Sequence, residues 1–231
     1  MIPLRDTIPS RSVPLANYLI IFANVVIFFL MVCAGRNAEA WVEHLGVVPA
    51  RLLDHPLSAQ WLTLLSSQFL HGGWFHLISN MWALFIFGDN VEDRLGSLRY
   101  LVFYLLGGVA GGLAHVFSDP ASDIPAVGAS GAISTVMAAY LVSYPRARII
   151  TLVPVFFLPW ILAIPAIVFI GLWFASQLLN GLFALAVGAQ ALGGVAYWAH
   201  VGGFVFGLVF LPVFLIGRRR RKPFADERLP W

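Results

Sequence analysis

The sequence predicts an all-α polytopic membrane protein, a bundle of six transmembrane helices, and three observations indicate this class. Of the 231 residues, 60% are hydrophobic and only 11% are charged, about half the charged fraction of an average soluble domain. The apolar residues form six segments, and the basic residues gather at the ends of these segments. That placement is typical of membrane anchoring, so the net charge of +3 does not indicate a nucleic-acid partner.

We expect three parts: an N-terminal tail at 1–17, a six-helix domain at 18–217 and a basic C-terminal tail at 218–231. The first 17 residues lack the apolar core and cleavage site of a removable signal peptide. The six spans are predicted at 18–34, 74–87, 100–117, 128–144, 163–184 and 195–216. Prolines 154, 159 and 165 interrupt the apolar run before the fifth span, so 149–162 is predicted to be an interfacial connection.

The distribution of basic residues predicts the orientation of these spans. Twelve of the 14 Lys and Arg residues flank the spans on one side, and the other two, Arg36 and Arg51, lie in the long first loop. The positive-inside rule therefore places both termini in the cytoplasm. Because the tails are short and no transit peptide is recognisable, we expect a multi-pass protein of a prokaryotic cytoplasmic membrane.

This orientation brings four polar side chains to one depth. Spans two, four and six all enter from the outer face, and His76, Asn80, Ser130 and His200 lie near the starts of these spans. His76 and Asn80 are four residues apart and share a helix face. Taken singly, Ser130 fits a helix N-cap and Asn80 fits an interhelical hydrogen bond. Their common depth instead favours one site, since ionisable groups inside a membrane are costly and usually functional.

Small residues on the sixth span allow the hydroxyl and the imidazole to meet. Gly203 and Gly207 form a small-xxx-small pair on the face that carries His200, so this helix can approach another closely. A serine and a histidine about 2.6–3.2 Å apart are the pair that nucleophilic acyl transfer requires.

Four motifs resemble the rhomboid intramembrane serine proteases, in order and in placement, over nearly the whole chain. They are His-Gly-Gly-Trp-Phe-His-Leu-Ile-Ser-Asn at 71–80, Val-Glu-Asp-Arg-Leu-Gly at 91–96, Gly-Ala-Ser-Gly at 128–131 and Ala-His-Val-Gly-Gly at 199–203. The resemblance implies a rhomboid-like bundle of six helices. It also implies that Ser130 is the nucleophile and His200 the general base. His76, Asn80 and the Ser130 backbone N–H would stabilise the oxyanion.

The same resemblance marks Glu92 and Arg94 as a structural pair after the second span. Two positions depart from the family pattern. Leu62 stands where many members have arginine, and Ser134 stands where some members have an aromatic ring that stacks on the histidine. We therefore expect His200 to be either less firmly oriented or supported by another residue.

The implied function is a serine endopeptidase that cleaves transmembrane proteins near the outer membrane boundary through an acyl-enzyme, without a cofactor or a metal. The expected partners are transmembrane substrates and the lipid bilayer; the oligomeric state is not predicted. The alternative is a catalytically silent rhomboid-like protein that binds membrane clients, although inactive relatives usually lack the serine or the histidine. The sequence has no His-Glu-x-x-His zinc motif and shows neither inverted repeats nor mid-span charges that would indicate a transporter.

Overall fold

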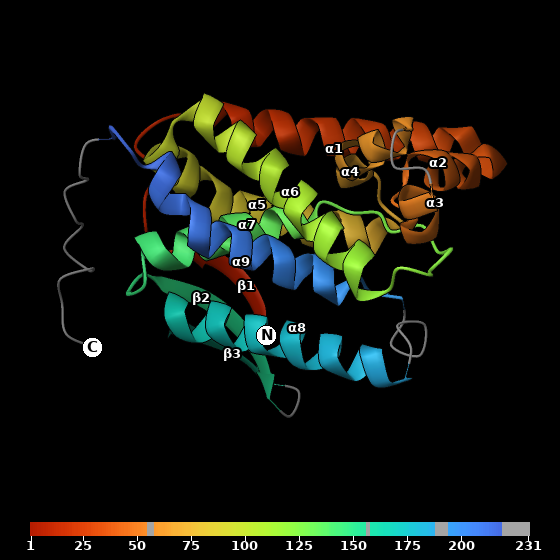
Figure 1. The fold of residues 1–231 in the computed structure, drawn as a ribbon. Coiled ribbons are helices and arrows are strands. Elements are labelled where there is room, and N and C mark those ends of the chain that lie inside the picture. Colours follow the sequence, from red (N-terminus) through yellow and green to blue (C-terminus); the bar gives the residue numbers. More distant parts are fainter. Residues whose placement is uncertain (55–57, 156–157, 188–193, 219–231) are drawn as a thin grey trace.

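The computed structural model describes residues 1–54, 58–155, 158–187 and 194–218. In these ranges, helices occupy all six predicted span positions: α1 (Leu15–Ala34), α5 (Trp74–Leu95), α6 (Ser97–Ser118), α7 (Ser130–Ser143), α8 (Ala166–Val187) and α9 (Tyr197–Phe214). The helices run side by side (Figure 1). We call the end where α1 begins and α9 ends the terminal end, and the opposite end the loop end. The predicted helical membrane fold is confirmed.

Among the described residues, four helical segments are long and apolar enough to cross a membrane, which supports a multi-pass membrane protein. They are Leu15–Leu45, Ser97–Ser118, Ala166–Ala186 and Tyr197–Phe214. Helix α7 has only 14 residues, and α5 carries four charged residues near its end. The exact count of six spans therefore stays a prediction. Helix α5 continues past the predicted span end at Phe87 to Leu95, and Val91 and Leu95 in this extension are buried.

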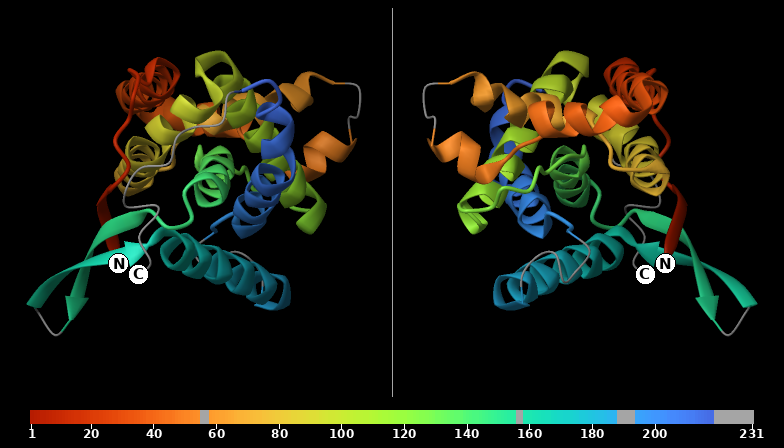
Figure 2. Two further views of the ribbon diagram at one scale, coloured as in Figure 1. Left: turned by 90° about the vertical axis from the view of Figure 1, so that its left-hand side faces the viewer. Right: turned by 90° about the vertical axis from the view of Figure 1, so that its right-hand side faces the viewer.

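Helix α7 lies at the centre of the bundle. Figure 2 shows α5, α6 and α9 around it, and every residue from Gly131 to Tyr140 is buried. Because protein surrounds this helix, its length need not match the bilayer. The first residue of α7, Ser130, is thereby placed inside the bundle near the loop end.

A three-stranded antiparallel sheet at the terminal end was not predicted. Strand β1 (Ile2–Asp6) pairs with β2 (Arg148–Val155), which pairs with β3 (Leu158–Pro165). The described residues of 149–162, expected to be an interfacial connection, are therefore largely strand. The β-branched side chains of β2 favour this conformation, and the prolines disfavour a helix. The sheet projects from the helices beside α8 (Figure 2).

The two predicted tails are described to different extents. Residues 2–6 of the expected N-terminal tail are strand β1, and α1 already begins at Leu15 instead of residue 18. Only Arg218 of the expected C-terminal tail lies within the described residues; its guanidinium Nε donates to the backbone carbonyl of Arg94.

Glu92 joins the end of α5 to the beginning of α1. Its buried carboxylate accepts hydrogen bonds from the backbone N–H groups of Ala16, at 3.0 Å, and Asn17, at 2.7 Å. It also accepts one from the Ser97 hydroxyl, at 2.5 Å. The first N–H groups of a helix have no partner within the helix, and a negative charge there interacts favourably with the helix dipole. Glu92 thus caps a helix that begins with no side-chain cap of its own.

Asp6 connects the sheet to the helices. Its Oδ2 accepts hydrogen bonds from the Tyr140 hydroxyl on α7, at 2.6 Å, and from Asn90 Nδ2 on α5, at 3.1 Å. Burial raises the pKa of the Asp6 carboxyl to about 6; the Tyr140 bond opposes this shift, and the neighbouring Asp89 carboxylate adds to it. The folded protein therefore binds a proton at Asp6 more tightly than the unfolded chain does.

We expect thermal stability in detergent to fall as the pH rises from about 4 to 7. An unfolded aspartate has a pKa of about 3.9, so across this window the folded state holds the proton that the unfolded chain releases, and linkage then lowers the free energy of unfolding. A shift of this size corresponds to about 2–3 kcal/mol. Melting curves of the wild type and Asp6→Asn test this expectation. The variant should show a shallower pH dependence, and equal slopes would contradict the assignment.

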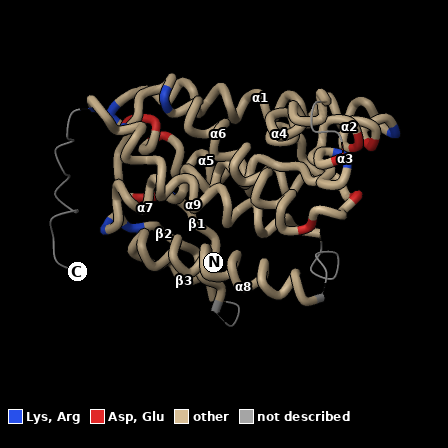
Figure 3. Tube along the Cα trace, viewed as in Figure 1, with Lys and Arg blue, Asp and Glu red and all other residues tan. Residues whose placement is uncertain are grey.

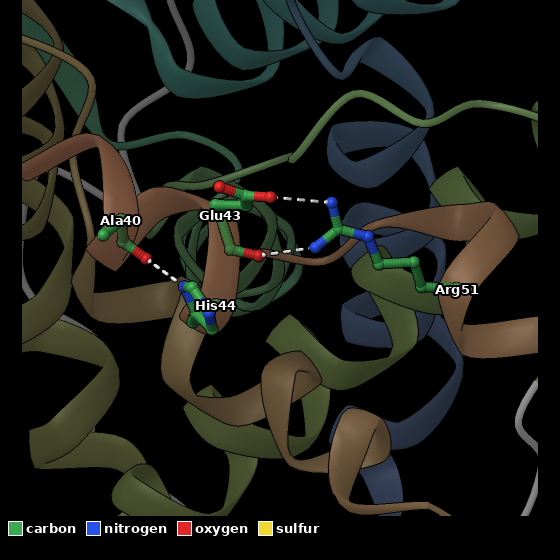
Figure 4. A network of polar contacts seen from close by, with 4 residues as sticks. All are labelled: Ala40, Glu43, His44 and Arg51. Atoms are coloured by element: carbon green, nitrogen blue, oxygen red, sulfur yellow. Dashed lines mark hydrogen bonds and ion pairs between the residues drawn. The ribbon is translucent and has the colours of Figure 1, made fainter.

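The long connection between α1 and α5 folds into short helices at the loop end: α2 (Ala38–Leu45), α3 (Pro49–Asp54) and α4 (Thr63–Ser66), with 3₁₀ turns at Gly35–Asn37, Ala59–Leu62 and Ser67–Phe69. Arg51 links two of these helices by contacting the Glu43 carbonyl and carboxylate, both at 3.1 Å (Figure 4). In the same network, His44 Nδ1 lies 2.8 Å from the Ala40 carbonyl. Both partners of the ion pair are exposed, so it adds little stability.

Charged residues gather toward the two ends of the helix bundle (Figure 3). The middle of the bundle is covered by uncharged residues, and many large apolar side chains there are exposed, Phe22, Phe85 and Val209 among them. An uncharged apolar band between two charged ends is what a lipid bilayer requires of a helical protein.

Candidate active site

The backbone before α7 is shaped by a glycine that faces His76. Gly128 has a φ of +133°, a conformation that L-residues rarely adopt. A Cβ atom at this position would lie 2.7 Å from the His76 ring and 3.7 Å from the Ser130 hydroxyl. The missing side chain therefore leaves space between the imidazole and the hydroxyl. The Gly128 N–H donates to the Ser67 carbonyl, at 2.9 Å, which fixes this segment.

The predicted serine and histidine lie within hydrogen-bonding distance. Ser130 Oγ at the start of α7 lies 2.7 Å from His200 Nε2 on the first turn of α9. Both side chains are partly buried. The two residues are 70 positions apart in the sequence, so the contact depends on how α7 and α9 pack.

Glycines allow α7 and α9 to approach backbone to backbone, as the small-residue pattern indicates. A Cβ on Gly203 would lie 2.0 Å from the Gly131 carbonyl oxygen, and one on Gly207 would lie 2.6 Å from that of Thr135. The Thr135 hydroxyl donates to the Gly203 carbonyl, at 2.6 Å, across this contact. A Cβ on Gly111 of α6 would likewise lie 2.5 Å from the Ala199 carbonyl oxygen of α9.

His71 links Asn80 to His76. Asn80 Nδ2 lies 3.0 Å from His71 Nε2, and the His71 ring contacts the His76 ring edge-on, with centroids 5.0 Å apart. Burial lowers the pKa of His71 to about 3, and His76 acts in the same direction. A neutral His71 can accept a hydrogen bond from the Asn80 amide, which leaves the second hydrogen on Nδ2 free to donate elsewhere. His71 thus orients the Asn80 side chain.

His200 has support that the sequence analysis did not identify. Ser134, at the position where some relatives have an aromatic ring, donates to the Ser130 carbonyl of its own helix, at 2.6 Å. Two other rings flank the imidazole instead: Trp173 of α8, with centroids 6.0 Å apart, and Tyr197 of α9, at 6.4 Å. On the side away from Ser130, His200 Nδ1 lies 2.7 Å from Gln177 Oε1.

Gln177 had a recognisable signal in the sequence. It belongs to a short polar group, with Ser176 and Asn180, in an otherwise apolar span, and polar side chains within spans often carry function or join helices. The other departure from the family pattern, Leu62, lies in the 3₁₀ turn Ala59–Leu62 and is exposed.

A small cavity adjoins the serine. Its volume is about 30 Å³, enough for about two water molecules. Its lining includes Ser130, Gly131, Gln68, His115 and Ser67. The cavity therefore offers polar partners as well as space for water beside the hydroxyl.

A family comparison identifies the domain to which these helices belong. The family model for the rhomboid domain matches residues 58–217, which include all the helices from α4 to α9. This match covers more than half of the chain.

Three relatives illustrate the similarity. The chain is 31% identical over 154 residues to "Presenilin-associated rhomboid-like protein A, mitochondrial" of Danio rerio, covering 65% of this chain and 37% of that protein. It is 28% identical over 197 residues to the human "Presenilin-associated rhomboid-like protein, mitochondrial", covering 83% and 46%. It is 34% identical over 128 residues to "Rhomboid protease GluP" of Bacillus subtilis, covering 55% and 24%.

The matched regions span less than half of each of these three relatives. The domain match nevertheless covers the region in which the serine and the histidine meet. The chain belongs to the rhomboid family.

Proposed function

We propose that this protein is an intramembrane serine endopeptidase that cleaves transmembrane proteins near the outer membrane boundary. The observation that carries the proposal is the 2.7 Å contact between Ser130 Oγ and His200 Nε2, made between two helices of a membrane bundle. A nucleophile within hydrogen-bond reach of a base is the requirement of covalent acyl transfer. The Bacillus subtilis relative is itself named a rhomboid protease, which points the same way.

In the proposed reaction, Ser130 Oγ attacks the substrate carbonyl while its proton passes to His200 Nε2. The resulting tetrahedral oxyanion is stabilised by His76, Asn80 and the Ser130 N–H. The space that a side chain at position 128 would fill lies beside both the His76 ring and the Ser130 hydroxyl. The C–N bond then breaks, and His200 returns the proton to the leaving amine. A water molecule, for which the adjoining cavity has room, hydrolyses the acyl-enzyme through the same proton transfers.

The distribution of Lys and Arg residues supports the proposed orientation of the protein in the membrane. Twelve of the 14 basic residues flank one side of the spans, which favours cytoplasmic termini and a site near the outer face. A prokaryotic cytoplasmic membrane stays a prediction, because two of the three relatives named above are mitochondrial and one is bacterial.

The test is cleavage of a single-span model substrate by the purified protein in liposomes, with product masses that locate the bond. We expect the wild type to cut one bond near the outer end of the substrate span and Ser130→Ala to cut none. Binding of the substrate without cleavage by either protein would overturn the proposal and favour the client-binding alternative.

We expect Asn80→Ala to lower kcat by about 10²–10³-fold with little change in KM. Loss of one oxyanion donor has this effect in other hydrolases, because the donor acts chiefly on the transition state. The matched control is Ser79→Ala, one residue away, where an exposed hydroxyl donates to the His76 carbonyl of its own helix. Steady-state kinetics of both variants check this. A loss of less than threefold in Asn80→Ala would exclude Asn80 from the oxyanion site.

A further inference from the structure

Gln177 contacts the ring nitrogen of His200 that does not face the serine. Gln177 Oε1 lies 2.7 Å from His200 Nδ1, and Ser130 Oγ lies 2.7 Å from His200 Nε2. The imidazole is therefore held between side chains from two different helices, α8 and α7. The proposed chemistry uses only the second of these contacts.

Hydrogen bonds along α8 fix which end of the Gln177 amide faces the histidine. Gln177 Nε2 donates to Ser176 Oγ, at 3.1 Å, and the Ser176 hydroxyl donates to the Trp173 carbonyl, at 2.6 Å. The carbonyl oxygen of the amide, which can only accept, is thus directed at His200. His200 Nδ1 must then carry the proton, and Nε2 is left with the lone pair that a general base needs.

We propose that Gln177 is a positioning residue for His200, the third member of a hydrogen-bond chain in which Ser130 donates to His200, His200 to Gln177, and Gln177 to Ser176. This inference rests on the proposed function. When Nε2 receives the serine proton, Nδ1–H continues to donate to Gln177 Oε1, and the proton on Nε2 later passes to the leaving amine. Gln177 gains and loses no proton in the cycle.

Gln177 takes the place that a carboxylate has in a serine–histidine–aspartate triad. Helices α7 and α9 contain no Asp or Glu, so neither helix can supply such a carboxylate. A neutral amide fixes the tautomer and the orientation of the imidazole ring, which are the main roles of the carboxylate in such a triad. It stabilises the imidazolium less than a carboxylate does, because a hydrogen bond to a charged acceptor is about twice as strong.

The test compares Gln177→Leu, which removes the acceptor, with Gln177→Glu, which restores an acceptor with a negative charge. We expect Gln177→Leu to lower kcat by about 10–100-fold with KM nearly unchanged, by analogy with lost outer-shell partners elsewhere. Gln177→Glu should be more active than Gln177→Leu, and the acidic limb of its pH–rate profile should move to higher pH. A purely structural role would not move that limb.

The matched control is Asn180→Leu, which removes another partly buried amide from the same helix. It should keep wild-type kcat and the wild-type pH profile. If the wild type cleaves substrate and Gln177→Leu matches its kcat, the inference about Gln177 is wrong while the proposed function stands. If the wild type itself does not cleave, the proposed function has failed. Should Gln177→Leu not fold, an unshifted pH profile in Gln177→Glu would overturn the inference.

Discussion

Ser130→Ala is expected to abolish cleavage, with kcat reduced by at least about 10⁴-fold, because it removes the hydroxyl that forms the proposed acyl-enzyme. Losses of the nucleophile or the base in other serine proteases reach about 10⁶-fold. His200→Ala should cause a loss of similar size, since the Ser130 proton then has no acceptor at 2.7 Å. Single-turnover cleavage assays measure both variants.

The double variant distinguishes a catalytic pair from two independent contributions. Ser130 and His200 act in the same step, so Ser130→Ala/His200→Ala should be no less active than either single variant. The matched control is Ser134→Ala, which removes a hydroxyl from the same helix that donates to the Ser130 carbonyl, and it should cleave at close to the wild-type rate. Multiplicative losses in the double variant would show that the two residues do not act as a unit.

Gly203→Ala is expected to cause a large loss of activity although it removes no reacting group. The added Cβ would lie 2.0 Å from the Gly131 carbonyl oxygen, a backbone atom that cannot move unless α7 and α9 separate. Overpacking of this kind typically costs about 1–3 kcal/mol of stability. A displacement of about 1 Å between reacting groups can lower the rate about 10²-fold. Thermal melting and cleavage rates in detergent measure the two effects.

The matched control for this substitution is Gly171→Ala, because a Cβ on Gly171 of α8 would meet no described atom within 4 Å beyond its chain neighbours and the adjoining backbone of its own helix. Gly171→Ala should melt and cleave like the wild type. If Gly203→Ala did the same, the close approach of α7 and α9 would not be what holds Ser130 beside His200.

The meeting of Ser130 and His200 could be predicted from sequence because a membrane restricts the possible arrangements. Each span must cross to the other side, so the starts of spans two, four and six share one face. Depth follows from that alternation, and the glycines at 203 and 207 indicate where helices approach. The alternation of the spans and the local glycine pattern both hold even if the predicted span boundaries are wrong by several residues.

The sheet could not be predicted in the same way. The run from Arg148 to Pro165 is almost continuously apolar, so it lacks the alternation of polar and apolar residues that marks a half-buried strand. Its pairing with Ile2–Asp6 joins segments about 145 residues apart, and no local pattern encodes such a partner.

The role of Gln177 depends on which face of α8 is turned toward α9, and the sequence does not predict this. This helix is apolar on nearly all sides, so hydrophobic periodicity does not say which face meets α9. The hydrogen-bond partners of Glu92 could not be predicted from the sequence either. The family resemblance marked Glu92 as structural, yet the groups it bonds are the backbone N–H groups of Ala16 and Asn17, about 75 positions away, and backbone donors carry no sequence signature.

The most direct test of the central claim is reaction of the purified protein with a fluorophosphonate, followed by intact and peptide mass measurement. Ser130 Oγ would form a bond to phosphorus, fluoride would leave, and His200 would take the hydroxyl proton. We predict one adduct per chain, on the peptide that contains Ser130, formed at least about 10²-fold more slowly in His200→Ala. An unmodified wild-type protein, or an adduct on any other residue, would contradict the account.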